Sequence, residues 1–133
     1  MESLLPLLLL ISITSVIGLL LRAKKGVIKK GTRVKISEGE FGGKYGSRLT
    51  ILQFSTTFCS ECRTAKAIVN DVVKDFEDIA YVEVDAESNL ELVRRVDIRS
   101  TPTTIFLDSK GFEIARAKGA PKRDQLIKAI KAI

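Results

Sequence analysis

Residues 3–21 form a run without a charged side chain, rich in leucine, isoleucine and valine. As an α-helix this run would be roughly 28 Å long, close to the thickness of the hydrocarbon core of a bilayer. A chain of 133 residues builds one small domain, which has no interior large enough to cover a helix that is apolar on all sides. The run therefore predicts an N-terminal transmembrane anchor, residues 1–21, that contacts the lipid bilayer through residues 3–21.

Two other interpretations of this run are a buried core helix and a cleaved signal peptide. A signal peptide begins with a positively charged region and ends at small residues. Here the chain begins with Met1 and Glu2, and the run ends at Leu21 and Arg22. Because neither end fits a signal peptide, the sequence favours an uncleaved anchor.

The net charge of +6 is concentrated directly after the apolar run, and the rest of the chain is nearly neutral. The basic residues of this stretch are Arg22, Lys24, Lys25, Lys29, Lys30 and Arg33. A nucleic-acid-binding domain carries its basic excess on the folded surface, so no nucleic-acid partner is expected. Basic residues beside an anchor favour the cytoplasmic side, which predicts a single-pass protein of the cell membrane with residues 22–133 in the cytoplasm.

The pattern after the run predicts a basic linker and the N-terminal part of a domain in residues 22–47, with a short first strand at 34–36, and the main domain in residues 48–133. Apolar, β-favouring runs predict strands at 49–54, 79–84, 103–108 and 112–117. Apolar spacings of three and four predict helices from residue 60, after Ser88 or Asn89, and at the C-terminal end. A strand–helix–strand crossover implies parallel pairing and the hairpin at 109–111 implies antiparallel pairing. The expected fold class is α/β, with a mixed sheet flanked by helices.

The chain has two cysteines, Cys59 and Cys62, and no histidine. This count excludes a disulfide-rich scaffold and a four-ligand zinc site built from Cys and His alone, so neither a metal site nor a cofactor is predicted. Cys59 falls where a predicted strand meets a helix N-terminus, which stabilises a thiolate. Cys62 lies one turn later, within reach of the same sulfur, so the pair is suited to thiol–disulfide exchange. A static disulfide and a Cu(I) site between two thiolates are the alternatives.

Several motifs in a fixed order make residues 48–133 resemble the thioredoxin family. They are the strand at 49–54 (LTILQF), then 58–63 (FCSECR), 82–85 (VEVD), 96–103 (VDIRSTPT), 108–111 (DSKG) and 118–120 (KGA). The resemblance implies a thioredoxin fold in which Cys59 attacks a disulfide and Cys62 resolves the mixed disulfide. It also implies a cis Pro102 that faces the cysteines, with Thr101 offering its backbone to an extended substrate. Membrane-tethered relatives are often extracytoplasmic, which is the alternative to the cytoplasmic location.

The chain departs from the family pattern at the residues that surround the cysteines. Phe58, a predicted substrate-binding residue, replaces the usual Trp, and Ser60 and Glu61 replace the usual Gly-Pro. Gln53 stands where the family has a buried aspartate that moves the proton of the resolving thiol, and Tyr81 stands where it has a lysine. A glutamine is no general base at neutral pH, so proton transfer at Cys62 is expected to be slower or to pass through water or Glu61. The carboxylate of Glu61 is expected to raise the pKa of Cys59 and make the couple more reducing.

Together these features predict a membrane-tethered thiol–disulfide oxidoreductase that reduces protein disulfides through Cys59 and Cys62. Its expected partners are protein disulfides and a membrane or soluble thiol reductant that recharges the pair. A non-catalytic thioredoxin-fold adaptor in a membrane assembly and a dithiol carrier of Cu(I) remain as alternatives.

Overall fold

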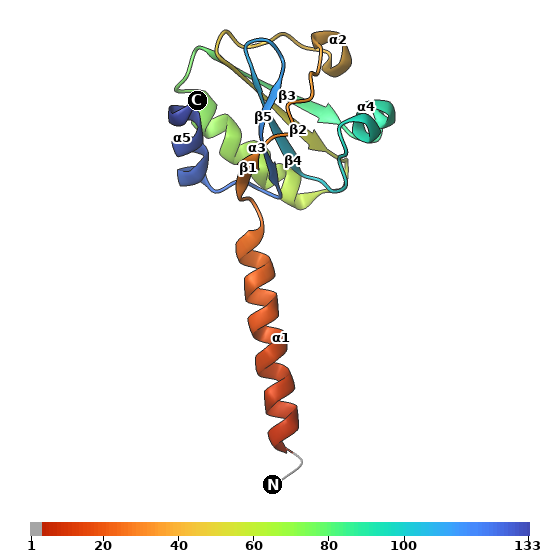
Figure 1. Ribbon diagram of the computed structural model, residues 1–133, viewed down its shortest axis with the longest axis vertical. Helices are drawn as coiled ribbons and strands as arrows, with labels where there is room; N and C mark the ends of the chain where they lie inside the picture. The colour runs from red at the N-terminus through yellow and green to blue at the C-terminus, as the bar shows by residue number, and fades with distance from the viewer. Residues whose placement is uncertain (1–3) are drawn as a thin grey trace.

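A computed structural model describes residues 4–133 as one long helix followed by a single α/β domain (Figure 1). The first three residues of the predicted anchor lie outside the described residues. The helices are α1 (Leu4–Lys24), α2 (Glu38–Phe41), α3 (Ser60–Val73), α4 (Leu90–Arg95) and α5 (Arg123–Ala132). The strands are β1 (Ile28–Lys30), β2 (Leu49–Ser55), β3 (Ile79–Asp85), β4 (Thr103–Asp108) and β5 (Glu113–Lys118).

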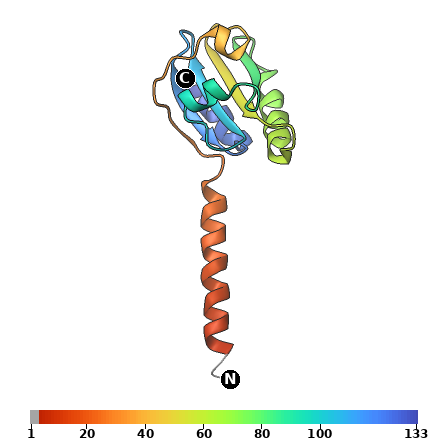
Figure 2. The same cartoon turned by 90° about the vertical axis from the view of Figure 1, so that its right-hand side faces the viewer.

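Helix α1 projects away from the domain (Figure 2). Its large apolar side chains, from Leu4 to Leu21, are exposed. None of its residues from Leu4 to Lys24 is buried. The hydroxyls of Ser12 and Thr14 donate to the carbonyls of Leu8 and Leu10, at 2.8 and 2.9 Å, so these polar groups are satisfied within the helix. Length and composition suit a membrane span, and an N-terminal signal sequence has the same features. The helix continues to Lys24, so the first basic residues are helical and do not belong to a linker.

The five strands form one mixed sheet in the order β1-β5-β4-β2-β3. β2 and β3 are parallel, whereas the β4–β5 hairpin, the β2–β4 pair and the β1–β5 pair are antiparallel. The predicted crossover and hairpin are therefore confirmed.

The first strand differs from the prediction. Residues 28–30 pair with β5 as an edge strand, inside the stretch expected to be a linker. The expected strand at 34–36 is reduced to one isolated bridge between Lys35 and Phe112. Lysines are common on edge strands, where their charge prevents pairing with another chain. A strand of three residues with two lysines therefore has the sequence character of a linker.

Helices cover both faces of the sheet, which explains why every residue of β2 is buried. On one face Leu49 and Ile51 pack with α3 and α5, and on the other Leu52 and Phe54 pack with α2 and α4. In Figure 1 the N-terminal end of α3 and the loop before β4 lie at the end of the domain from which α1 departs. The fold thus places the strand–helix junction that carries the cysteines on the same side as the apolar helix.

Candidate active site

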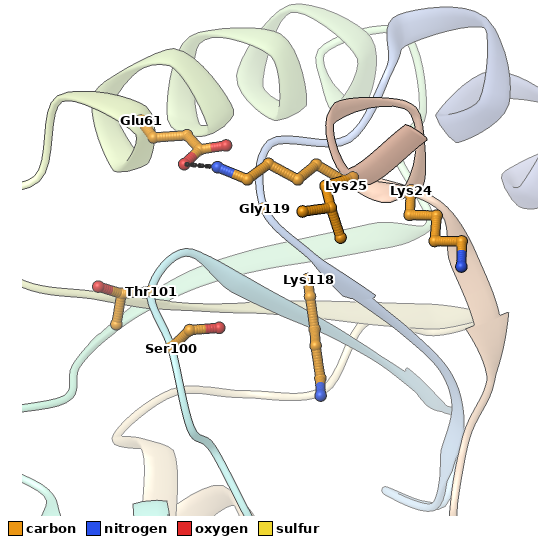
Figure 3. A pocket seen from close by; sticks show the side chains of 8 residues that line it. Lys24, Lys25, Glu61, Ser100, Thr101, Lys118 and Gly119 are labelled. Atoms are coloured by element: carbon orange, nitrogen blue, oxygen red, sulfur yellow. Dashed lines mark ion pairs between the residues drawn. The ribbon is translucent and has the colours of Figure 1, made fainter. Parts of the chain in front are cut away.

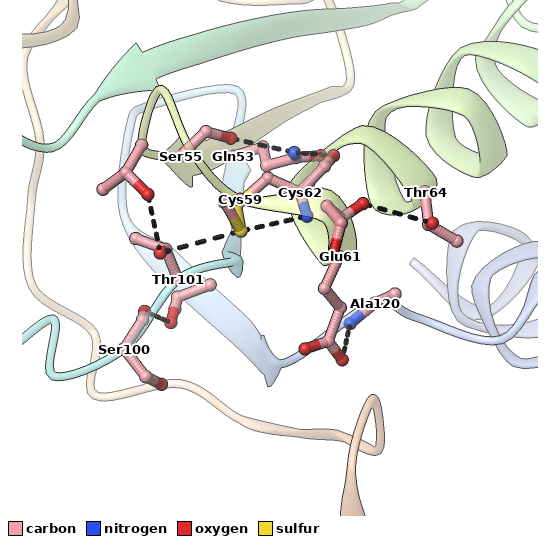
Figure 4. The surroundings of a disulfide bond; sticks show 12 residues. Gln53, Ser55, Cys59, Glu61, Cys62, Thr64, Ser100, Thr101 and Ala120 are labelled. Atoms are coloured by element: carbon pink, nitrogen blue, oxygen red, sulfur yellow. Dashed lines mark hydrogen bonds between the residues drawn. A yellow bond between two sulfur atoms is a disulfide. The ribbon is translucent and has the colours of Figure 1, made fainter.

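Cys59 is the N-cap residue of α3, reached by a short turn from the end of β2. Its Sγ accepts a hydrogen bond of 3.1 Å from the backbone N–H of Cys62. The two cysteines are joined by a disulfide with a Cα–Cα distance of 5.2 Å (Figure 4). Cys59 is half-buried, whereas Cys62 is only 4% exposed. Only the first sulfur is therefore open to a partner, and it lies where backbone N–H groups stabilise a thiolate.

The loop before β4 faces the first cysteine. The Thr101–Pro102 bond is cis, as the resemblance implies, and Pro102 is buried. The Thr101 hydroxyl lies 3.9 Å from Cys59 Sγ, and the N–H of Gly119 donates to the Pro102 carbonyl at 2.8 Å. The structure therefore brings Thr101, the residue before the cis Pro102, to the disulfide from a segment about forty residues further along the chain.

Gln53 lies beneath the second cysteine and is completely buried. Its Nε2 donates to the carbonyl of Cys62 and to the hydroxyl of Ser55, both at 2.9 Å (Figure 4). Its Oε1 accepts from the hydroxyl of Tyr81, also at 2.9 Å. Burial raises the pKa of Tyr81, with a smaller contribution from Glu83, so this phenol is neutral at physiological pH. Gln53 replaces the aspartate of the family pattern, and Tyr81 replaces its lysine. The two replacements thus form one neutral hydrogen-bonded pair.

Glu61, between the cysteines, points away from α3 toward the start of the domain. Its Oε2 lies 4.0 Å from Lys25 Nζ (Figure 3), and its Oε1 accepts from the N–H of Ala120 at 3.5 Å. The charge that the sequence placed beside Cys59 is therefore partly balanced by a lysine just after α1. The sequence does not indicate that Lys25 lies near the site, because Cys59 follows it by 34 positions.

A cavity of about 230 Å³ lies between the end of α1 and the loops at the cysteines. Lys25 from the chain after α1, Glu61 from α3 and Thr101 from the loop before β4 all line it (Figure 3). Phe58, the residue before the motif, is 97% exposed. Among residues 4–133 no group of three or more His, Cys, Asp or Glu side chains could hold a metal ion.

A disulfide between an N-cap cysteine and a buried partner, with the residue before a cis proline beside its outer sulfur, defines a protein that exchanges dithiol for disulfide. The Thioredoxin family model matches residues 34–132, beginning earlier than the resemblance at residue 48. The chain belongs to the thioredoxin family, and the thioredoxin fold expected from the resemblance is confirmed. Membership and the Cys59–Cys62 pair together support thiol–disulfide oxidoreductase activity, the enzyme class that the sequence predicts.

Similar proteins include thioredoxins from plants and animals. Thioredoxin H5 of Oryza sativa subsp. japonica is 34% identical over 77 residues, which are 58% of this chain and 56% of the rice protein. Thioredoxin of Ophiophagus hannah is 27% identical over 65% of this chain and 80% of its own length. The chain thus spans little more than half of the rice relative.

Solved structures show the same fold. Thioredoxin-2, described as a component of malaria parasite protein secretion machinery, matches with a TM-score of 0.59 and 26% identity over 65% of this chain and 84% of its own. Fasciola hepatica thioredoxin matches with a TM-score of 0.58 and 25% identity over 65% of this chain and 82% of its own. In each case about a third of this chain lies outside the match.

Proposed function

We propose that the chain is a membrane-tethered thiol–disulfide oxidoreductase that reduces protein disulfides, with Cys59 as the nucleophile and Cys62 as the resolving thiol. The observation that carries this assignment is the position of Cys59 Sγ at the N-cap of α3, where it accepts the N–H of Cys62 at 3.1 Å. A sulfur held there is stabilised as the thiolate that attacks disulfides. Cys59 is half-buried, which suits the nucleophile that meets the substrate, and Cys62 is buried, which suits the resolving thiol.

The reaction balances over two steps. The Cys59 thiolate attacks one sulfur of a substrate disulfide, forming a mixed disulfide and releasing the other sulfur as a thiolate that takes up a proton. Cys62, after losing its proton, attacks Cys59 Sγ and releases the second substrate thiol. Two electrons pass to the substrate, and the Cys59–Cys62 disulfide remains until an external thiol reductant restores the dithiol.

The neighbouring residues support defined roles in these steps. Thr101 lies beside Cys59 and precedes the cis Pro102. Both residues are proposed to bind an extended substrate segment, with the exposed Phe58 as an apolar contact. Gln53, which holds the Cys62 carbonyl, supplies no ionisable carboxyl. The proton of Cys62 is therefore proposed to leave through water or through Glu61.

The proposed tether is α1, and we propose that the domain begins near residue 28, since β1 is the first strand of the sheet. A tether confines the dithiol to the membrane surface and raises its effective concentration toward membrane partners. The basic residues after α1 support a cytoplasmic domain. Labelling of intact cells with a membrane-impermeant maleimide, with the protein in its reduced form, tests on which side of the membrane the domain lies. Labelling of Cys59 from outside would place the domain outside.

The first test of function is the reduction potential of the full chain in detergent, equilibrated with glutathione and followed by mass. A value below roughly −230 mV supports a reductase, and a value near −120 mV makes the protein an oxidant. Trapping provides the second test: Cys62→Ser is expected to accumulate a mixed disulfide with substrate, and Cys59→Ser to accumulate none.

A non-catalytic adaptor is the second candidate, favoured by one observation, the neutral Gln53 where a proton-transferring carboxyl is expected. An adaptor retains its cellular role when Cys59 is replaced by Ser, whereas an oxidoreductase loses it. If Cys59 and Cys62 do not exchange with glutathione at all, the oxidoreductase proposal fails.

A further inference from the structure

A single residue connects α1 to the first residue that is hydrogen-bonded to the sheet. α1 ends at Lys24, and the N–H of Gly26 already donates to the carbonyl of Lys118 in β5 at 2.6 Å. Gly26 is buried and has a φ of +74°, and a Cβ at this position would collide with the Ala120 carbonyl. Only Lys25 therefore separates the apolar helix from a residue fixed to the sheet. The domain cannot swing freely about the end of α1 as it could on a flexible linker.

This short connection holds one particular end of the domain against the end of α1. Lys25 extends from the end of the helix to Glu61 of the C-x-x-C loop (Figure 3). Leu21, from the last turns of α1, lines the same cavity as Glu61 and Thr101. The end of α1 and the loops that surround the disulfide are therefore walls of one cavity. The N-terminal end of α3, which carries the cysteines, lies at the end of the domain from which α1 departs (Figure 1).

The position of Leu21 relates this cavity to the bilayer. The uncharged run ends at Leu21, so that residue marks the boundary of the hydrocarbon core if α1 spans the membrane. The polar headgroup layer beyond that boundary is on the order of 5–7 Å thick. Since Leu21 and Glu61 line one cavity of about 230 Å³, an α1 that spans the membrane holds the C-x-x-C loop at the headgroup layer. Phe58, 97% exposed in that loop, is an apolar ring of the kind that interfaces accommodate.

The charge of the cavity lining limits what enters it. Lys24, Lys25 and Lys118 contribute three positive charges, and Glu61 contributes the one negative charge. Lys25 is already engaged with Glu61, which leaves a basic lining beside Thr101. A segment that brings an acidic side chain next to its cysteine is complementary to this lining, whereas a basic segment is repelled.

We propose that the dithiol acts on disulfides held at the membrane surface, in acidic segments of membrane proteins within a few residues of the bilayer. This inference rests on the proposed function and names the substrate class of the same site. The electron balance is that of the proposed reaction: the juxtamembrane disulfide becomes two thiols, Cys59 and Cys62 become a disulfide, and a thiol reductant restores the pair.

The test uses the reduced full chain in phosphatidylcholine vesicles together with single-span peptides oriented the same way. One peptide carries a disulfide three residues beyond its span and another carries it twenty residues beyond, with the same acidic flanking sequence. Single-turnover reduction, followed by mass, is expected to be at least tenfold faster for the near disulfide. Equal rates, or a faster far disulfide, would overturn the inference.

Two further arms separate position from charge. Insertion of ten Gly/Ser residues between Lys24 and Lys25 is expected to remove the preference for the near disulfide, while reduction of a soluble peptide of the same sequence stays unchanged and shows that the variant is folded. Replacing the acidic flanks of the near peptide by lysines is expected to slow its reduction several-fold, and an unchanged rate would refute the charge complementarity. If the intact protein reduces neither the membrane peptides nor the soluble one, the proposed function itself fails, whereas reduction of all of them at one rate rejects only this inference.

Discussion

The hydroxyl of Tyr81 donates to Gln53 Oε1 across neighbouring parallel strands, directly beneath the resolving cysteine. Gln53 in turn holds the carbonyl of Cys62 at 2.9 Å. The pair connects β3, β2 and the first turn of α3 through neutral groups alone. A site of this kind orients the resolving cysteine without an ionisable carboxyl under it, and each of its hydrogen bonds is open to measurement.

Replacing Tyr81 by Phe removes the donor and leaves the buried Gln53 Oε1 without a partner. A buried polar atom left unsatisfied costs about 1–3 kcal/mol, so the free energy of unfolding is expected to fall by that amount in denaturant titrations. Tyr45→Phe is the matched control, because Tyr45 is also half-buried and donates one hydrogen bond, to the Ile36 carbonyl at 2.7 Å. The Tyr45→Phe substitution is expected to leave dithiol exchange unchanged. A Tyr81→Phe protein as stable as the wild type would contradict this account of Gln53.

Gln53→Glu introduces a carboxyl at a completely buried position. Ionised, it cannot donate to the Cys62 carbonyl, so burial and repulsion are expected to raise its pKa in the folded state above the value of about 4.3 in the unfolded chain. The destabilisation is therefore small below pH 4.3 and grows as the pH rises toward the folded pKa, reaching about 3 kcal/mol at pH 7. Unfolding at pH 4 and pH 7 measures the difference. Asn70→Asp on the exposed face of α3 is expected to lack this pH dependence.

Lys25 and Glu61 form an ion pair that couples the end of α1 to the redox centre. Glu61→Gln removes a negative charge near Cys59, stabilises the thiolate and is expected to raise the reduction potential by roughly 10–20 mV. Lys25→Met leaves Glu61 uncompensated and is expected to lower the potential. In the double variant Lys25→Met/Glu61→Gln no carboxylate is left without its counter-charge. Adding Lys25→Met to Glu61→Gln is therefore expected to leave the reduction potential unchanged. Additive shifts in the glutathione equilibrium would show that the two residues do not interact.

The local elements of the fold were predictable from the sequence, because each is encoded by neighbouring residues. The apolar spacing of α3, the β-favouring run of β2 and the cysteine spacing all lie within short windows. β1 was missed since three residues with two lysines carry no strand signal, and only pairing with β5 creates the strand.

The contacts of the site could not be predicted from the sequence, because they join residues that are far apart in the chain. Gln53 and Tyr81 were each recognisable as departures from the family pattern, but their hydrogen bond depends on the pairing of β2 with β3. Lys25 reaches Glu61 only because Gly26 is fixed to β5. Such pairs arise from tertiary structure, and no local sequence pattern predicts them.

Glu113 is a completely buried carboxylate at the start of β5. It accepts from Arg116 Nε at 2.6 Å and from the Thr32 hydroxyl at 2.6 Å, while Arg116 also donates to the Val96 carbonyl at 2.8 Å. This network connects the chain before the domain core to the loop that leads to Pro102. Glu113→Gln leaves the guanidinium uncompensated and is expected to cost about 3 kcal/mol or more. The control Arg99→Gln, in an exposed ion pair, is expected to leave the unfolding midpoint within error, and equal effects of the two variants would contradict the role of burial.

Arg48 connects the start of β2 to two other parts of the domain. It donates to both carboxylate oxygens of Asp78, at 2.5 and 3.3 Å, and to the carbonyl of Ile130 at 2.9 Å. The hydrogen bond from Arg48 lowers the pKa of Asp78 below its ordinary value. A lowered folded pKa gives stability that is present above the unfolded value of about 3.9 and is lost as the pH falls through the folded pKa. Arg48→Met is therefore expected to reduce the thermal midpoint more at pH 7 than at pH 2.5, as followed by circular dichroism.

The Asp78→Asn variant separates this linkage from the contact with Ile130. In that background no carboxylate titrates against Arg48, so the effect of Arg48→Met should be the same at both pH values and should report only contacts of the guanidinium that do not depend on pH, among them the hydrogen bond to the Ile130 carbonyl. A pH dependence that persists in Asp78→Asn would assign it to another carboxyl group and would remove Asp78 as its source.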